Sequence, residues 1–151
     1  MNYYGERIGV SMSRQPVIIV DADAIIGQTD AKDPHHQKSM EISQKLLELK
    51  AQVLYPVTAI LEANAHMQRV LHSTADAYEV AQMMTDSAFT VVEVSKQTLT
   101  KALKYFNPTT SKKNTLFDCV VAAIAEEHEA DAIFSFDQFY TKKGFTLAEK
   151  L

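Results

Sequence analysis

Apolar positions follow two different periods along this chain. Residues 17–20 form a continuous run of branched apolar side chains, which is typical of a strand buried on both faces of a parallel sheet. Elsewhere the apolar residues recur every three or four positions, which indicates helices with one buried side. Together the two periods predict strands at 17–20, 53–57, 90–94 and 132–136, and helices over 33–49, 58–70, 74–87, 95–106 and 116–129.

Polar and proline residues mark the ends of these predicted elements. Asp33-Pro34 fits an N-cap followed by a proline in the first turn, and Thr58 and Ser95 are candidate N-caps. Asn107-Pro108 ends the fourth helix. Pro56 interrupts the second strand, which favours a place near the edge of the sheet. Two stripes are expected to be buried: Ile60, Ala63, Met67 and Val70, then Leu99, Ala102, Leu103 and Phe106.

The order of strands and helices predicts the fold class. Alternation of this kind favours an α/β protein, a single three-layer domain with a mainly parallel central sheet flanked by helices. Residues 1–15 show neither period and are interpreted as a loose N-terminal leader, so the domain is expected to span 16–151. The four glycines are scattered, which excludes a glycine-rich loop that cradles phosphate.

Composition narrows the functional classes. The 151 residues are enough for one domain. The formal net charge of −4 gives the chain no overall electrostatic attraction for nucleic acid or anionic membranes. Cys119 is the only cysteine, which excludes an internal disulfide and favours a reducing cytoplasm. No apolar run is long enough to span a bilayer, and the first 15 residues are too polar for a signal peptide.

Four acidic residues fall where a parallel sheet places its active site. Asp21 and Asp137 follow predicted strands, and Glu62 and Asp118 lie in the first turns of predicted helices. Because ligands bind beyond the carboxyl ends of parallel strands, these carboxylates are expected to converge in one cleft. Taken singly, each could be a helix cap or a solvated strand end.

Convergence of four carboxylates would require a cation. Two carboxylates about 5 Å apart repel each other by roughly 3 kcal/mol at an effective dielectric constant near 20. A divalent ion removes this repulsion, and an all-oxygen ligand set favours Mg²⁺ or Mn²⁺, as one or two ions. Such an ion can activate water and stabilise a phosphoryl oxygen.

The segments VIIVDADAII, TAILEANAHM, LFDCVVAAIAEEHEADAIF and SFDQFY carry a family resemblance. In order and spacing they resemble the PIN domains, in particular the VapC-like ribonuclease toxins, over about residues 16–145. The resemblance implies a Mg²⁺- or Mn²⁺-dependent endoribonuclease that hydrolyses RNA with activated water. It assigns the metal-binding and catalytic acids to Asp21, Glu62, Asp118 and Asp137, and the small hydroxyl residue to Ser135. It also implies a homodimer and an antitoxin protein as partners.

Asp23 departs from that family, which commonly has Ser, Asn or Thr at this position. Asp21-Ala22-Asp23 also resembles the nucleophile motif of haloacid-dehalogenase-like phosphatases, in which the first acid attacks phosphorus. That alternative assigns no role to Glu62. A third possibility is a non-catalytic PIN-like binding module. The favoured interpretation makes Asp21 a metal ligand and Asp23 an auxiliary residue.

Several other residues receive secondary predictions. Asn114 lies four positions before Asp118 and is expected to order groups near the metal. Lys112 and Lys113 lie near the predicted mouth of the site and are the candidates for RNA phosphate contact, with Arg14 and Arg69 as weaker ones. His35-His36 is interpreted as an exposed pair in a helix's first turn.

Overall fold

A parallel sheet forms the centre of the domain. The computed structural model describes residues 14–151. Strand β1 (Val17–Val20) lies between β2 (Gln52–Pro56) and β4 (Ala132–Phe134), and β3 (Thr90–Val92) pairs with the far side of β2. The strand order is β3-β2-β1-β4, and every named pairing is parallel. This confirms the predicted α/β class.

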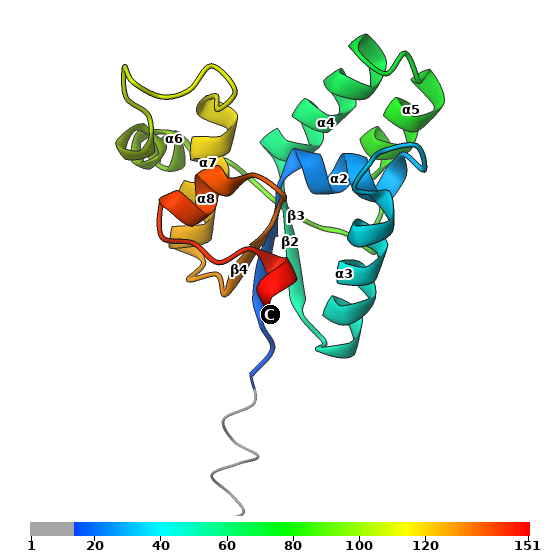
Figure 1. Ribbon diagram of the computed structural model, residues 1–151, viewed down its shortest axis with the longest axis horizontal. Coiled ribbons are helices and arrows are strands. Elements are labelled where there is room, and N and C mark those ends of the chain that lie inside the picture. Colours follow the sequence, from blue (N-terminus) through cyan, green and yellow to red (C-terminus); the bar gives the residue numbers. More distant parts are fainter. Residues whose placement is uncertain (1–13) are drawn as a thin grey trace, which may run out of the picture.

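Helices cover both faces of the sheet, which gives the three predicted layers (Figure 1). The side chains of β1 alternate between the faces: Ile18 and Val20 belong to one core cluster and Ile19 to the other. The first cluster packs against α2, α3, α4 and α5, and the second against α6, α7 and α8. The helices are α2 (Ala22–Thr29), α3 (His36–Glu48), α4 (Val57–Arg69), α5 (Thr74–Gln82), α6 (Lys96–Ala102), α7 (Leu116–Glu127) and α8 (Gln138–Lys142), with 3₁₀ turns η1 (Leu103–Tyr105) and η2 (Ala148–Lys150).

Strand β2 is an internal strand, so the prediction that Pro56 places it near an edge was wrong. Pro56 is the last residue of β2 and also the N-cap of α4, so its missing N–H falls where the ladder ends. Helix α4 therefore begins at Val57, and Thr58 is not its cap. Two short helices next to strand ends, α2 and α8, were absent from the sequence prediction.

The predicted buried stripe of the fourth helix is largely exposed. Among its members only Ala102 is buried, whereas the side chains of Leu99, Leu103 and Phe106 are exposed. The α-helix ends at Ala102 and continues as a 3₁₀ turn, which changes the period and turns the later apolar residues away from the core. In α4, Ile60, Ala63 and Met67 are buried as expected, whereas Val70, which follows the last residue of the helix, is exposed.

The amino end of the sheet is closed by an ion pair. Arg14 contacts Asp131 at 2.7 Å, and Asp131 also accepts a hydrogen bond from the N–H of Val17. This end lies opposite the carboxyl ends of the strands, so Arg14 is at the other end of the sheet from the acids, and its contact with RNA stays a prediction. Residues 1–13 of the predicted leader lie outside the described part of the chain. Within residues 14–151 no helix is long and apolar enough to cross a membrane.

Candidate metal centre

Three of the four predicted acids meet at the carboxyl edge of the sheet. Asp21 follows β1, Glu62 lies in the second turn of α4, and Asp118 lies in the first turn of α7. One carboxylate oxygen from each lies within 4.8 Å of the others. Two oxygens bound to one Mg²⁺ at about 2.1 Å lie at most about 4.2 Å apart. The donor set therefore fits such an ion with small side-chain movements.

Burial raises the pKa values of all three carboxyl groups. The pKa of Asp21 lies well above its ordinary value because the group is buried, and the charges of Asp23 and Asp118 add to the effect. Burial and then Asp118 raise the pKa of Glu62 to about 7. Burial also raises the pKa of Asp118, against the opposing N–H of Thr115. Among residues 14–151 no lysine or arginine forms an ion pair with these acids. The cluster thus holds protons or requires a cation.

Tyr140 contacts two of the three acids. Its hydroxyl donates a hydrogen bond to Oδ2 of Asp21 at 2.8 Å and lies 3.4 Å from Oδ1 of Asp118. Burial and the charge of Asp21 raise the pKa of Tyr140, so the phenol stays protonated and remains a donor. Sequence reasoning missed this residue, because α8 was not predicted and nothing in the sequence linked position 140 to Asp21.

Asp137 lies beside the cluster and is not one of the three converging acids. Its Oδ2 accepts a hydrogen bond from the side-chain amide of Asn114 at 2.8 Å, and that amide also lies 3.4 Å from Asp118. Its Oδ1 caps α8 by accepting from the N–H of Phe139. Asn114 thus joins Asp118 to Asp137, near the position expected for it. The metal-ligand role of Asp137 stays a prediction.

Asp23 and Ser135 connect the cluster to the loop after β4. Oδ2 of Asp23 accepts hydrogen bonds from Oγ of Ser135 at 3.0 Å and from the N–H of Phe136 at 2.8 Å. Oγ of Ser135 also lies 3.1 Å from Oδ2 of Asp21, so its single proton serves one carboxylate at a time. Burial raises the pKa of Asp23 to about 6, although these donors oppose the rise. Oδ1 of Asp23 is buried and has no hydrogen-bond partner among the described residues.

A cavity of about 350 Å³, here called the acidic cavity, opens over Glu62 and Asp118. Two histidines to which the sequence analysis gave no part in the site also line it. His66 lies one helical turn after Glu62, a spacing that could have revealed it, and His35 comes from the segment before α3. The acidic cavity is lined by Ala22, Asp23, Ile26, Asp33, His35, Glu62, His66, Lys113, Thr115 and Asp118.

A second cavity of about 500 Å³, here called the lysine cavity, adjoins the first through Lys113, which lines both. Lys142 and Lys143 lie in its wall together with Asn114 and Asp137. Of the two predicted RNA-contacting lysines, Lys113 lines this cavity and Lys112 does not. Lys142 and Lys143 escaped sequence analysis because they belong to α8 and the residue after it.

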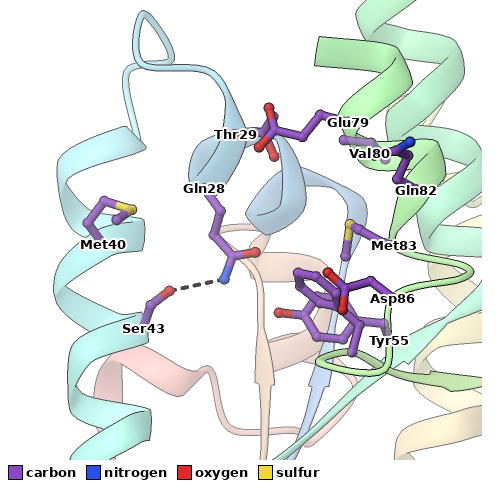
Figure 2. A pocket seen from close by; sticks show the side chains of 11 residues that line it. Gln28, Thr29, Met40, Ser43, Tyr55, Glu79, Val80, Gln82, Met83 and Asp86 are labelled. Atoms are coloured by element: carbon purple, nitrogen blue, oxygen red, sulfur yellow. Dashed lines mark hydrogen bonds between the residues drawn. The ribbon is translucent and has the colours of Figure 1, made fainter. Parts of the chain in front are cut away.

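A third cavity of about 500 Å³ lies between α2, α3 and α5, and Figure 2 shows its lining. Tyr55 and Phe89 meet edge to face there, and Gln28 donates a hydrogen bond to Ser43. Glu79 and Asp86 supply its only charged groups, and no lysine or arginine lines it. This third cavity therefore has neither the clustered carboxylates nor the cations of the other two.

Comparisons with known proteins agree with this geometry. The chain matches the family model of the PIN domain over residues 18–145. No curated protein matches it significantly. VapC20 of Mycobacterium tuberculosis, described as a toxin that cleaves the sarcin-ricin loop, superposes with a TM-score of 0.74 at 14% identity over 85% of this chain and 96% of that chain.

Two further solved structures share the fold. FitAcB from Neisseria gonorrhoeae has a TM-score of 0.63 at 14% identity, over 89% of this chain and 99% of that chain. FitAB bound to an IR36 DNA fragment has a TM-score of 0.60 at 14% identity, over 86% of this chain and 92% of that chain. At such low identity these likenesses show the fold alone, whereas the family match covers most of the sequence. The chain belongs to the PIN domain family.

Proposed function

We propose that the protein is a divalent-metal-dependent endoribonuclease that hydrolyses phosphodiester bonds of RNA. The observation that carries this proposal is the cluster of Asp21, Glu62 and Asp118, which has no cationic partner among the described residues and adjoins a cavity lined by lysines. Family membership and the fold shared with VapC20 support the same reaction class.

The residues have distinct roles in this proposal. Asp21, Glu62 and Asp118 hold Mg²⁺ or Mn²⁺, and Asp137 with Asn114 completes the site for one or two ions. The bound ion supplies an activated water and stabilises charge on the phosphoryl group. Tyr140 and Ser135 orient Asp21 by hydrogen bonds.

Lysines supply the attraction for RNA that the net charge of −4 does not. Lys113, Lys142 and Lys143 line the lysine cavity, and Lys113 also faces the acidic cavity. Phosphates of a strand in the lysine cavity would therefore pass beside the metal. Lys112 and Arg69 line neither cavity.

The phosphatase alternative fits the observed hydrogen bonds less well. In that mechanism Asp23 acts as acid and base toward a substrate on Asp21. Here one oxygen of Asp23 is engaged by Ser135 and Phe136 in the loop after β4. A non-catalytic binding module would have no need for three mutually repelling acids, two of them buried and one half-buried, which destabilise the metal-free fold.

Cleavage of a labelled RNA pool with Mn²⁺ and with EDTA tests the proposal. The wild-type protein should cleave only with the metal, Asp118→Asn should lose cleavage, and Glu129→Gln, a matched change in an exposed loop, should retain it. The same samples are offered a small phosphomonoester. Monoester turnover with an aspartyl-phosphate on Asp21 and intact RNA would refute the nuclease in favour of the phosphatase.

The proposed toxin role requires an antitoxin protein that inhibits the nuclease. The proposed location is the cytoplasm, because a reducing compartment suits the buried, free Cys119. The third cavity suits a protein segment with an apolar and a basic side chain, because aromatic rings and the carboxylates of Glu79 and Asp86 line it. A double charge reversal, Glu79→Lys with Asp86→Lys, should keep RNA cleavage and abolish inhibition by the product of the neighbouring gene. Inhibition that survives the reversal would place the partner elsewhere.

A homodimer is the expected assembly. Exposed apolar side chains lie on α6, η1 and the start of α7, namely Leu99, Leu103, Phe106, Leu116 and Phe117. Light scattering should find a dimer that Leu103→Lys dissociates and Leu47→Lys, an equally apolar exposed site on α3, does not. A wild-type monomer would contradict this expectation.

A further inference from the structure

We propose that the ring of His35 is a stacking platform for a nucleobase of the substrate strand, next to the phosphate that is cleaved. The inference rests on the proposed ribonuclease function and adds to it the residue that recognises a base. It concerns binding of the strand and assigns no bond-breaking step to His35.

The platform consists of two stacked rings. The rings of His35 and Phe136 have centroids 4.2 Å apart and planes inclined by 6°. Phe136 is half-buried and its ring also meets Phe134 of the core edge to face at 6.2 Å. One face of the His35 ring rests on Phe136, and His35 itself is exposed to solvent. A flat aromatic face open to solvent is what an unpaired base stacks upon.

Both rings are held in place by their own segments. The N–H of His35 donates to Oδ1 of Asp33, and Nδ1 of the adjacent His36 lies 2.7 Å from the carbonyl oxygen of Gly27. A Cβ at Gly27 would clash with the side chain of Ser39 and stand 3.2 Å from its Cβ, so the glycine favours the close approach of α2 and α3.

On the other side, the N–H of Phe136 donates to Oδ2 of Asp23. These bonds hold the two segments, and the rings are stacked without a bound strand, which lowers the entropic cost of binding.

The position of the stack suits a strand that crosses the metal centre. His35 lines the acidic cavity with Glu62 and Asp118, whereas Phe136 lines the lysine cavity. The stack thus stands where the two cavities meet, and Lys113 faces both. A strand whose phosphates lie along the lysines and over the acids would bring one base beside His35.

Two other uses of His35 make different predictions. A charged imidazole that contacts phosphate would bind the backbone with or without a base. A purely structural stack, serving only to join the segment before α3 to the loop after β4, would leave strand binding unaltered when the metal centre is intact. Strands with and without bases, together with an aromatic replacement, separate these uses from base stacking.

The experiment compares the wild-type protein with His35→Ala, His35→Phe and His128→Ala. His128 is an exposed histidine at the opposite end of α7 from Asp118 and serves as the matched control. Each protein is titrated by fluorescence anisotropy with labelled oligo(A) and with an abasic strand of equal length, with Ca²⁺ in place of Mn²⁺. A gel checks that the strands stay intact. The thermal shift with Mn²⁺ and the cleavage of labelled RNA are measured on the same samples.

Stacking predicts a loss of roughly 10-fold in oligo(A) affinity for His35→Ala, within the range typical of base–aromatic contacts. Affinity for the abasic strand should change less than about 2-fold, and His35→Phe and His128→Ala should behave as wild type. The Mn²⁺ shift should be equal in all four proteins.

Three results would overturn the inference. The first is an equal loss of affinity for oligo(A) and for the abasic strand in His35→Ala. The second is a loss of oligo(A) affinity in His35→Phe as large as that in His35→Ala. The third is wild-type oligo(A) affinity in His35→Ala. A wild-type protein that neither binds nor cleaves RNA would instead refute the proposed function.

Discussion

Asp23→Asn should stabilise the metal-free protein in a pH-dependent way. Burial raises the pKa of Asp23 to about 6, whereas an unfolded aspartate titrates near 3.8. At about pH 3 and below, the carboxyl group is protonated in both states and resembles the amide. As the pH rises from about 4 to about 6, the unfolded chain loses its proton first, so the wild-type protein loses stability. Above about pH 6 the full penalty remains.

The magnitude follows from the difference between the two pKa values. About two units correspond to roughly 3 kcal/mol of unfolding free energy at about pH 8. An asparagine keeps one oxygen for the N–H of Phe136 and carries no charge, so it escapes this penalty. For a domain of this size, roughly 3 kcal/mol is worth about 6–12 °C in melting temperature.

The assay is a series of thermal melts in EDTA at several pH values, with Asp86→Asn as the exposed control. The gap between Asp23→Asn and wild type should be near zero at about pH 3 and reach several degrees at about pH 8. The control should show no such widening. A gap that stays constant with pH, or a less stable variant at about pH 8, would show that Asp23 is ionised without cost and would refute the reasoning.

Three further predictions concern the metal and its ligands. Because burial raises the pKa of Glu62 to about 7, Mn²⁺ binding at neutral pH should release about half a proton from this group. Calorimetry in two buffers of different ionisation enthalpy measures this release, and identical binding heats in the two buffers would contradict it. Tyr140→Phe should keep the fold and weaken Mn²⁺ binding by ~10–100-fold, since Asp21 loses a hydrogen bond; unchanged affinity would exclude an orienting role. Asp21→Asn should abolish RNA cleavage, whereas Asp23→Ser should lose at most ~10–100-fold, and equal loss in both would place Asp23 in the metal's own ligand set.

The sequence determined the strands and the edge at which the site lies. A strand with branched apolar side chains on both faces, such as residues 17–20, can bury them only between two layers of helices, so its burial on both faces was predictable. Asp21 ends that strand, and parallel strands bring their carboxyl ends together. Hence the meeting of Asp21 with Asp118, 97 positions later, followed from local pattern and topology alone.

Tertiary structure decided which groups surround the acids. Pro56 indicated a place near the edge, yet β2 is internal, because β3 pairs with Leu54–Pro56 and the proline lacks its N–H only at the last position of the ladder. Helices α2 and α8 are too short to show a reliable hydrophobic period. Because α8 was not predicted, the sequence could not place Tyr140, Lys142 and Lys143 near the site. The stack of His35 on Phe136 joins residues 101 positions apart through two loops. Such contacts depend on distances between packed elements, and the hydrophobic period of a sequence specifies which face is buried but not how closely two loops approach.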